Sequence, residues 1–266
     1  MTMMTAKKVS DDDKNAYFQR KRKFEGRTFL VTRTAEGNKV EREKLEVFGA
    51  QVIELPLIEI KAPSNPSKLE DQIKKIEQFD WIVFTSANGV RIFFSKFRDL
   101  AKLEGAKFAC VGPETQRALE AFGFKASLVP SEFLTRRLGQ ELARLGLKGK
   151  RVLLARAEEA NPEIGEVLRE AGAIVVETPV YRTEAKKLDN LNEEFLLQKN
   201  ITDITLSSPS TVKGLLLNFP PEKFRSTNVK IHCIGPVTAD SARKAGLEVV
   251  TVAKVHTIDG MIWEIA

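Results

Sequence analysis

Residues 29–57 read FLVTRTAEGNKVEREKLEVFGAQVIELPL, and residues 152–180 repeat this pattern as VLLARAEEANPEIGEVLREAGAIVVETPV. The two stretches align without gaps at an offset of 123 residues. Two shorter pairs of matching stretches are FTSANGV at 84–90 with LSSPSTV at 206–212, and CVGPETQRALEAFGF at 110–124 with CIGPVTADSARKAGL at 233–247. A near-constant offset between copies is typical of a structural unit that occurs twice. We therefore expect two copies of one fold beyond the first 25 residues.

Each copy alternates short apolar runs with amphipathic segments. The apolar runs are rich in β-branched and aromatic residues, as buried parallel strands are, and they lie at 28–32, 81–85, 108–111, 151–155, 204–206 and 229–234. The segments at 40–48, 89–103, 115–122 and 163–171 carry apolar residues at helical spacing, and a glycine follows several of them. This alternation predicts an α/β protein with two similar domains, each a doubly wound parallel sheet of the flavodoxin-like type. The stretches at 55–61 and 178–184 are expected to pair as extended connectors.

Composition narrows the class of protein. The chain has 266 residues, of which 42% are hydrophobic, enough for two buried cores. No apolar run reaches the roughly 18 residues of a membrane span, and the start lacks the apolar stretch of a signal peptide, so we expect a cytoplasmic protein without a membrane partner. Half of the net charge of +6 falls within residues 1–25, which we expect to be a leader or a disordered tail. The weakly basic remainder does not favour nucleic acid and suits a small polyanion.

The cysteines and histidines do not indicate a metal site. Cys110 and Cys233 each end an apolar run before a Gly-Pro pair, where a buried and inert thiol is expected. His232 and His256 are the only two histidines, which makes a zinc site improbable.

From Gly26 to Ala266 the chain resembles the uroporphyrinogen-III synthase family. The order and spacing of seven short motifs carry the resemblance: VTR at 31–33, PLIEI at 56–60, FTSANGV at 84–90, VGPET at 111–115, PVYRT at 179–183, SSPSTV at 207–212 and IGPVT at 234–238. The resemblance implies a cyclising hydro-lyase of haem biosynthesis that needs no cofactor and no metal. Its reaction closes the linear tetrapyrrole hydroxymethylbilane with loss of water and inversion of ring D, which gives uroporphyrinogen III.

The resemblance also implies how the chain is divided. Domain one is expected to be discontinuous, at 26–54 plus 186–266, domain two at 63–177, and the connector strands at 55–62 and 178–185. The expected partner is a small polycarboxylate tetrapyrrole bound by a monomer, and a transient contact with the enzyme that makes hydroxymethylbilane stays open.

The repeated motifs follow strands and open helices. In parallel sheets, ligands bind beyond the carboxyl ends of the strands, where helix N-termini attract anions. The resemblance implies a substrate with eight carboxylates, and the residues that we expect to bind it are Ser86, Ala87, Asn88, Gly112, Thr115, Ser207, Ser208 and Thr238. The alternative is that the serines and threonines only cap their helices.

Two arginines stand at equivalent places after the first strand of each copy. The guanidinium groups of Arg33 and Arg156 are expected to bind substrate carboxylates, and the alternative is that they are only solvated. Lys61, Arg91 and Arg182 are further candidates.

Tyr181 is the expected catalytic residue. The resemblance implies that the reaction starts when the hydroxymethyl group of the substrate loses its hydroxyl, and a protonated phenol could hydrogen-bond that hydroxyl as a weak general acid. The alternative is a tyrosine ring packed at the hinge.

Other function classes have less support. A non-catalytic two-domain binder of a polycarboxylate or tetrapyrrole remains the alternative to the enzyme. No glycine-rich nucleotide motif follows a predicted strand, and we expect no added DNA-binding region before Ala266.

Overall fold

The computed structural model describes residues 22–97, 99–189, 191, 193–225 and 227–266. It divides into two compact units. Unit 1 comprises the chain up to Ile58 together with Ala185–Ala266, and unit 2 is Glu59–Glu184. The sequence placed 55–62 and 178–185 outside both domains, whereas the two unit boundaries fall within these stretches.

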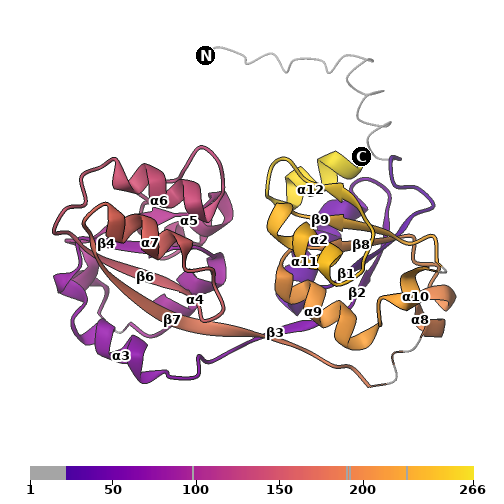
Figure 1. The fold of residues 1–266 in the computed structure, drawn as a ribbon, viewed down its shortest axis with the longest axis horizontal. Helices are drawn as coiled ribbons and strands as arrows, with labels where there is room; N and C mark the ends of the chain where they lie inside the picture. Colours follow the sequence, from indigo (N-terminus) through magenta and orange to yellow (C-terminus); the bar gives the residue numbers. More distant parts are fainter. Residues whose placement is uncertain (1–21, 98, 190, 192, 226) are drawn as a thin grey trace, which may run out of the picture. The chain divides into compact units, whose positions relative to one another are not determined.

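Unit 1 is a five-stranded sheet in the order β10-β9-β8-β1-β2, and its strand pairs are parallel (Figure 1). Its strands are β1 (Thr28–Val31), β2 (Gln51–Glu54), β8 (Asp203–Leu206), β9 (Lys230–Cys233) and β10 (Val249–Val252). Its helices are α2 (Ala35–Glu46), α8 (Glu193–Gln198), α9 (Pro209–Asn218), α10 (Glu222–Arg225), α11 (Pro236–Lys244) and α12 (Ile258–Ile265). Side chains of β1 alternate between two apolar clusters, because successive strand residues point to opposite faces. Leu30 packs with residues of α9 and α11, whereas Phe29 packs with residues of α2 and α12.

The folded part of unit 1 includes residues that we expected to belong to the leader. Phe24 is fully buried, and its ring packs 5.0 Å from that of Phe29 and 5.4 Å from that of Phe48. Its backbone N–H also donates to the carbonyl of Phe48 at 2.8 Å. Residues 22–25 therefore belong to unit 1, and the rest of the predicted leader, residues 1–21, lies outside the described residues.

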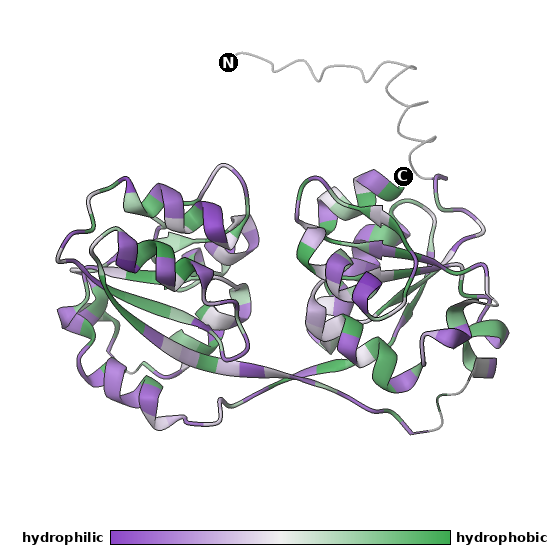
Figure 2. Ribbon diagram, viewed as in Figure 1, coloured by the Kyte–Doolittle hydropathy of each residue, from purple (hydrophilic) through white to green (hydrophobic). Residues whose placement is uncertain are grey.

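Unit 2 has the strand order β3-β7-β6-β4-β5, with parallel pairing of β4 to β5, β4 to β6 and β6 to β7 (Figure 1). Its strands are β3 (Ile58–Lys61), β4 (Trp81–Phe84), β5 (Lys107–Cys110), β6 (Arg151–Ala157) and β7 (Ile174–Ala185). Its helices are α3 (Ser67–Lys74), η1 (Ile76–Gln78), α4 (Ala87–Ser95), η2 (Leu100–Leu103), α5 (Pro113–Glu120), α6 (Thr135–Ala143) and α7 (Glu163–Glu170). Helices α4 and α5 pack on one face of the sheet, and α6 and α7 pack on the other. Figure 2 shows the hydrophobic strands and the mixed polar and apolar helices that this layering produces.

The second connector is part of a longer strand than the sequence indicates. Strand β7 has 12 residues and continues through the Pro179 position, with Tyr181 paired to Ala157 of β6. Strand β3 lies beside it in the sheet, so the two connectors pair as expected. The predicted α/β class with two similar parallel sheets and a two-stranded connector is confirmed.

The two repeat copies also have a glycine of the same backbone conformation just after their first helix. Gly49 and its repeat counterpart Gly172 have φ angles of 86° and 83°, which side chains other than that of glycine rarely adopt. None of the described helices is long and apolar enough to cross a membrane.

Candidate active site

The predicted site residues of unit 2 lie at the carboxyl edge of its sheet. Adjacent parallel strands β4 and β5 end at this edge, and helices α4 and α5 begin just beyond them. Ser86 caps α4, because its Oγ accepts the backbone N–H of Gly89 at 3.0 Å. Gly112 occupies the cap position of α5, and Thr115 lies in the first turn with 3% of its surface exposed. Ser86, Ala87, Asn88, Gly112 and Thr115 are therefore brought to one edge.

Tyr181 joins this edge from β7. Its hydroxyl lies 2.9 Å from Oγ of Ser86, and its side chain is buried in the cluster that includes Phe84. Burial raises the pKa of the Tyr181 phenol; the hydrogen bond with Ser86 opposes this increase, and the negative charge of Glu159 adds to it. The phenol is therefore protonated at neutral pH and available as a hydrogen-bond donor.

Unit 1 has an equivalent edge where β8 and β9 end. Ser208 caps α9 by accepting the backbone N–H of Thr211 at 3.3 Å, and the Ser207 N–H donates to the Thr211 hydroxyl at 3.2 Å. Gly235 occupies the cap position of α11, and Thr238 lies in its first turn, 3% exposed. Ser207, Ser208 and Thr238 thus share one edge, with the threonine nearly buried.

The two predicted arginines differ in their surroundings. Arg156 is 9% exposed, pairs with Glu177 at 2.5 Å and donates to the Asn161 carbonyl at 2.6 Å. This environment supports a structural role within unit 2 rather than the expected carboxylate contact. Arg33 is half-buried at the end of β1, and its Nε lies 3.2 Å from the place that a Cβ on Gly37 would occupy. The charge of Arg33 lowers the pKa of the buried Glu41 carboxyl, so Arg33 also has an acidic neighbour within its own unit.

The further candidate cations of unit 2 have partners of their own. Lys61 pairs with Glu59 and Glu184, Arg182 pairs with Glu184, and Arg91 donates to Asn88 at 3.3 Å.

The chain matches one family over most of its length. A family model described as Uroporphyrinogen-III synthase HemD covers residues 39–263. The porphyrin biosynthesis protein HemD of Ruminiclostridium josui is 32% identical over 261 residues, which are 96% of this chain and 51% of that protein. The chain belongs to the uroporphyrinogen-III synthase family. The uroporphyrinogen-III synthase of Synechococcus elongatus is 31% identical over 249 residues, with 89% of this chain and 93% of that protein covered.

Solved structures of synthases from this family share the fold. A crystal structure of a mutant uroporphyrinogen III synthase from the bacterium Thermus thermophilus has a TM-score of 0.58 and 21% identity, and covers 89% of this chain and 96% of that one. The uroporphyrinogen-III synthetase of Helicobacter pylori has a TM-score of 0.59 and 19% identity, with 89% and 97% covered. The predicted membership of the uroporphyrinogen-III synthase family is confirmed, and the alternative of a non-catalytic binder is not favoured. The chain spans about half the length of the Ruminiclostridium HemD protein that it matches.

This family member also contains a buried polar cluster that the motifs did not indicate. Both carboxylate oxygens of Glu41, Oγ1 of Thr205 and Nδ2 of Asn38 are buried without a hydrogen-bond partner in the described part of the chain. At the repeat offsets, the counterparts of Glu41 and Thr205 are the buried apolar residues Ile164 and Val83 of unit 2. A residue-by-residue comparison of the two copies, rather than a search for motifs, could have revealed the cluster.

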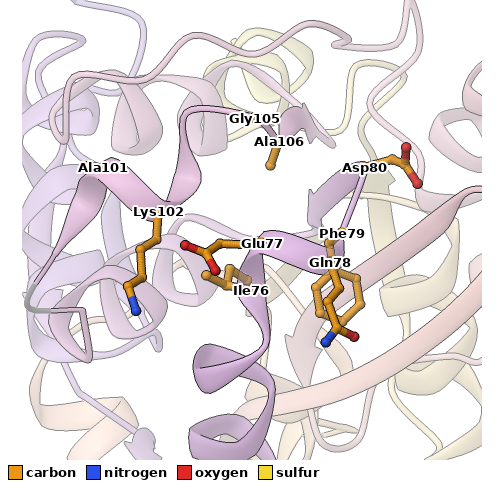
Figure 3. Close-up of a pocket in the computed structure, with 9 residues that line it drawn as sticks. All are labelled: Ile76, Glu77, Gln78, Phe79, Asp80, Ala101, Lys102, Gly105 and Ala106. Carbon is orange, nitrogen blue, oxygen red and sulfur yellow. The ribbon is translucent and has the colours of Figure 1, made fainter.

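Among the described residues, the other reactive groups form no second site. Burial raises the pKa of both Cys110 and Cys233 to about 12, so these thiols are inert as expected. In the described ranges, no group of three or more His, Cys, Asp or Glu side chains could hold a metal ion. A pocket of about 350 Å³ opens between η1, η2 and the starts of β4 and β5 (Figure 3). It lies at the amino edge of the sheet, opposite the candidate site.

Proposed function

We propose that this chain acts as a uroporphyrinogen-III synthase, which cyclises hydroxymethylbilane with loss of water and inversion of ring D. Family membership supports the reaction, and one observation supports the site. The Tyr181 phenol, protonated at neutral pH, meets a helix cap at the carboxyl edge of a parallel sheet, where ligands of such sheets bind.

In the proposed first step, the Tyr181 phenol donates a hydrogen bond to the hydroxyl of the terminal hydroxymethyl group. The phenol proton moves to that hydroxyl, which leaves as water, while the electron pair of the pyrrole nitrogen forms the azafulvenium cation. Transfer of the pyrrole N–H proton back to the phenolate then gives the azafulvene and restores the phenol. Ser86 holds the phenol in place, because its Oγ is itself fixed by the N–H of Gly89. A weak acid suffices, because this hydroxyl leaves readily from an electron-rich pyrrole.

The second part of the proposal is geometric catalysis. The substituted carbon of ring D must attack the azafulvene to give a spiro intermediate, which then rearranges with that ring inverted. Holding the reacting ends close together accelerates this route without a strong nucleophile or base. The proposed anchors are the helix starts after β4, β5, β8 and β9, together with Arg33, because backbone N–H groups and the positive ends of helix dipoles favour carboxylates.

We further infer that the enzyme works as a cytoplasmic monomer without a cofactor, as the family resemblance implies. A transient contact with the enzyme that makes hydroxymethylbilane would deliver this labile substrate directly.

The test of the function is a coupled assay with hydroxymethylbilane made in situ. The products are oxidised, and the type I and type III uroporphyrin isomers are separated chromatographically. We expect predominantly type III, well above a control without enzyme. If correctly folded protein gave only the type I isomer at the spontaneous rate, this result would contradict the proposal. The alternative of a non-catalytic tetrapyrrole or polycarboxylate binder would then remain.

Tyr181→Phe should lower kcat by about 10²-fold with little change in KM, the lower end of the range for general acid catalysis. The phenylalanine ring keeps the packing, so the thermal midpoint should stay near that of the wild type. Thr115→Ala and Thr238→Ala should have smaller effects, since they remove only one contact each.

The matched pair for the phenol contact is Ser86→Ala and Ser208→Ala. Each variant loses one helix cap, at a cost of about 1 kcal/mol, but only Ser86 holds the tyrosine. Ser86→Ala should therefore lower kcat more. A loss above about 10⁴-fold from any single substitution would contradict geometric catalysis, because that is the scale of a triad member.

A further inference from the structure

The imidazole of His256 lies against the glycine of the second Gly-Pro turn. A Cβ added to Gly235 would lie 2.9 Å from Cδ2 and 3.4 Å from Nε2 of His256. Gly235 is the cap residue of α11 and stands where β9 gives way to that helix. The half-buried ring of His256 is therefore part of the carboxyl edge of unit 1.

The internal repeat provides a comparison for this histidine. At the offset of 123 residues the counterpart of His256 is Phe133, and that of Gly235 is Gly112. A Cβ on Gly112 would lie 3.4 Å from Cβ and Cγ of Phe133. Both units thus place an aromatic ring against the equivalent glycine of the repeat. Because phenylalanine fills this place in unit 2, packing alone does not require an imidazole in unit 1.

The backbone fixes the position of the imidazole. The N–H of Thr257 donates to the carbonyl of Val255 at 2.8 Å, which closes a tight turn centred on His256. Thr257 then caps α12 by accepting the N–H of Gly260 at 2.9 Å. A Cβ on Gly260 would lie 2.1 Å from the Val255 carbonyl oxygen, so the helix start rests directly on the turn. The backbone at His256 is therefore fixed before any ligand arrives, and its ring packs against Gly235.

The acidic residues of α12 do not engage this histidine. Asp259 pairs with Lys44 at 2.6 Å, and Glu264 pairs with Lys254 at 2.9 Å. No hydrogen bond or ion pair joins the His256 ring to any other residue that the structure describes. An imidazole ring always has at least one N–H donor, and here that donor remains for a ligand.

We infer that His256 is a further substrate-binding residue, which donates a ring N–H to a carboxylate of the tetrapyrrole at the edge of unit 1. The inference rests on the proposed function, because it assigns one carboxylate contact of that substrate. Phe133 cannot donate a hydrogen bond, so the equivalent place in unit 2 offers only an apolar ring face. The two edges therefore differ in what they recognise.

The kinetic test uses His256→Phe, which installs the residue of unit 2, and His256→Gln, which keeps an N–H donor. We expect the phenylalanine variant to raise KM about 10-fold at nearly unchanged kcat and thermal midpoint, the size of one hydrogen bond to a charged group. The glutamine variant should restore most of the affinity. A wild-type KM in His256→Phe would overturn the inference alone, whereas a wild-type protein that makes only type I uroporphyrin would overturn the proposed function.

A binding measurement on the unmodified protein needs no turnover. The chain has two histidines, and His232 is buried, so the imidazole resonances are readily assigned by NMR. Titration with uroporphyrin III, which carries eight carboxylates, should shift the His256 resonances and leave those of His232 in place. Saturable binding without a shift at His256 would overturn the inference even if the variants failed to fold.

Discussion

Asp203→Asn should lower the free energy of unfolding of unit 1 by about 3–5 kcal/mol, the loss expected when one partner of a buried ion pair is removed. The Asp203 side chain is 1% exposed and accepts four hydrogen bonds. Arg27 donates two of them at 2.5 and 2.9 Å, and Thr202 and His232 donate at 2.7 Å each. An amide at this position would leave the Arg27 guanidinium without its counter-charge.

Asp203→Asn should also weaken the packing of residues that do not contact the carboxylate directly. The Arg27 guanidinium lies 4.8 Å from the ring centre of Phe24 and 4.9 Å from that of Phe29. Asp203 thus helps to hold the first described residues of the chain on the sheet. The amide N–H groups of Phe24 and its neighbours should exchange faster with solvent in Asp203→Asn.

The stabilisation of unit 1 by Asp203 depends on pH, and the lowered pKa of Asp203 decides the direction. Burial alone would raise the pKa of Asp203, but the hydrogen bonds from His232, Arg27 and Thr202 outweigh burial and lower it well below its usual range. The stabilisation is therefore complete above the ordinary aspartate pKa of about 4 and is lost as the pH falls below it. Unit 1 of the wild type should lose stability between about pH 5 and pH 2, and Asp203→Asn should lack this part of the acid dependence.

Each unit contains one tryptophan, which allows the two to be followed separately. Trp263 lies in unit 1 and Trp81 in unit 2, so denaturant unfolding in a Trp81→Phe background reports on unit 1. The control is Asp80→Asn, which removes the pair with Lys150 at the amino edge of the other sheet and is followed through Trp81 in a Trp263→Phe background. Asp80 is 35% exposed on its side chain, so this change should cost at most about 1 kcal/mol. If Asp203→Asn and Asp80→Asn lost the same free energy of unfolding, this result would contradict a special role of burial at Asp203.

The fold could be predicted from the sequence because the repeat and the strand–helix alternation are local patterns. The predicted strand at 28–32, for example, corresponds to β1 at Thr28–Val31. The sequence predicted the connector at 178–185 as a separate extended stretch, whereas pairing with β6 continues through Pro179 to Tyr181 and β7 is one strand. Tertiary pairing overrides a local proline signal in this case.

The candidate site was only partly predictable. Its helix starts follow from strand ends, but the contact between Tyr181 and Ser86 joins residues 95 positions apart and depends on sheet order and register. The burial of Arg156 depends in the same way on the pairing of β6 with β7, which brings Glu177 within reach. His256 and Glu41 were missed for another reason. They stand where the other copy has Phe133 and Ile164, and a pattern of apolar positions does not single out a polar residue among them.

Glu41→Ile should raise the free energy of unfolding of unit 1 by about 1–3 kcal/mol at pH 7, the usual cost of a buried group without a hydrogen-bond partner. Both oxygens of Glu41 are buried and lack a hydrogen-bond partner of good geometry in the described part of unit 1, and the nearby hydroxyl of Thr205 only partly offsets their burial. Adding Thr205→Val should increase the gain, because unit 2 fills the same two places with the apolar residues Ile164 and Val83. Replacing buried charged groups by apolar residues of similar volume is often stabilising.

The pH dependence distinguishes this gain from simple repacking. Burial raises the pKa of Glu41, and Arg33, Thr205 and Lys44 only partly offset the increase. A raised pKa means that the folded state holds a proton more tightly than the unfolded chain does, so this contribution is complete below the ordinary glutamate pKa of about 4.3 and is lost as the pH rises through the folded value. The stability advantage of Glu41→Ile over the wild type should therefore grow with pH, opposite in sign to the effect of Asp203.

Two control variants test this pH dependence. Glu41→Gln, which cannot titrate, should also remove the pH dependence of stability. The reverse change in unit 2, Ile164→Glu, should introduce this pH dependence and lower the free energy of unfolding by several kcal/mol. A pH-independent difference between Glu41→Ile and the wild type would show that Glu41 keeps its charge in the folded protein, held by Arg33.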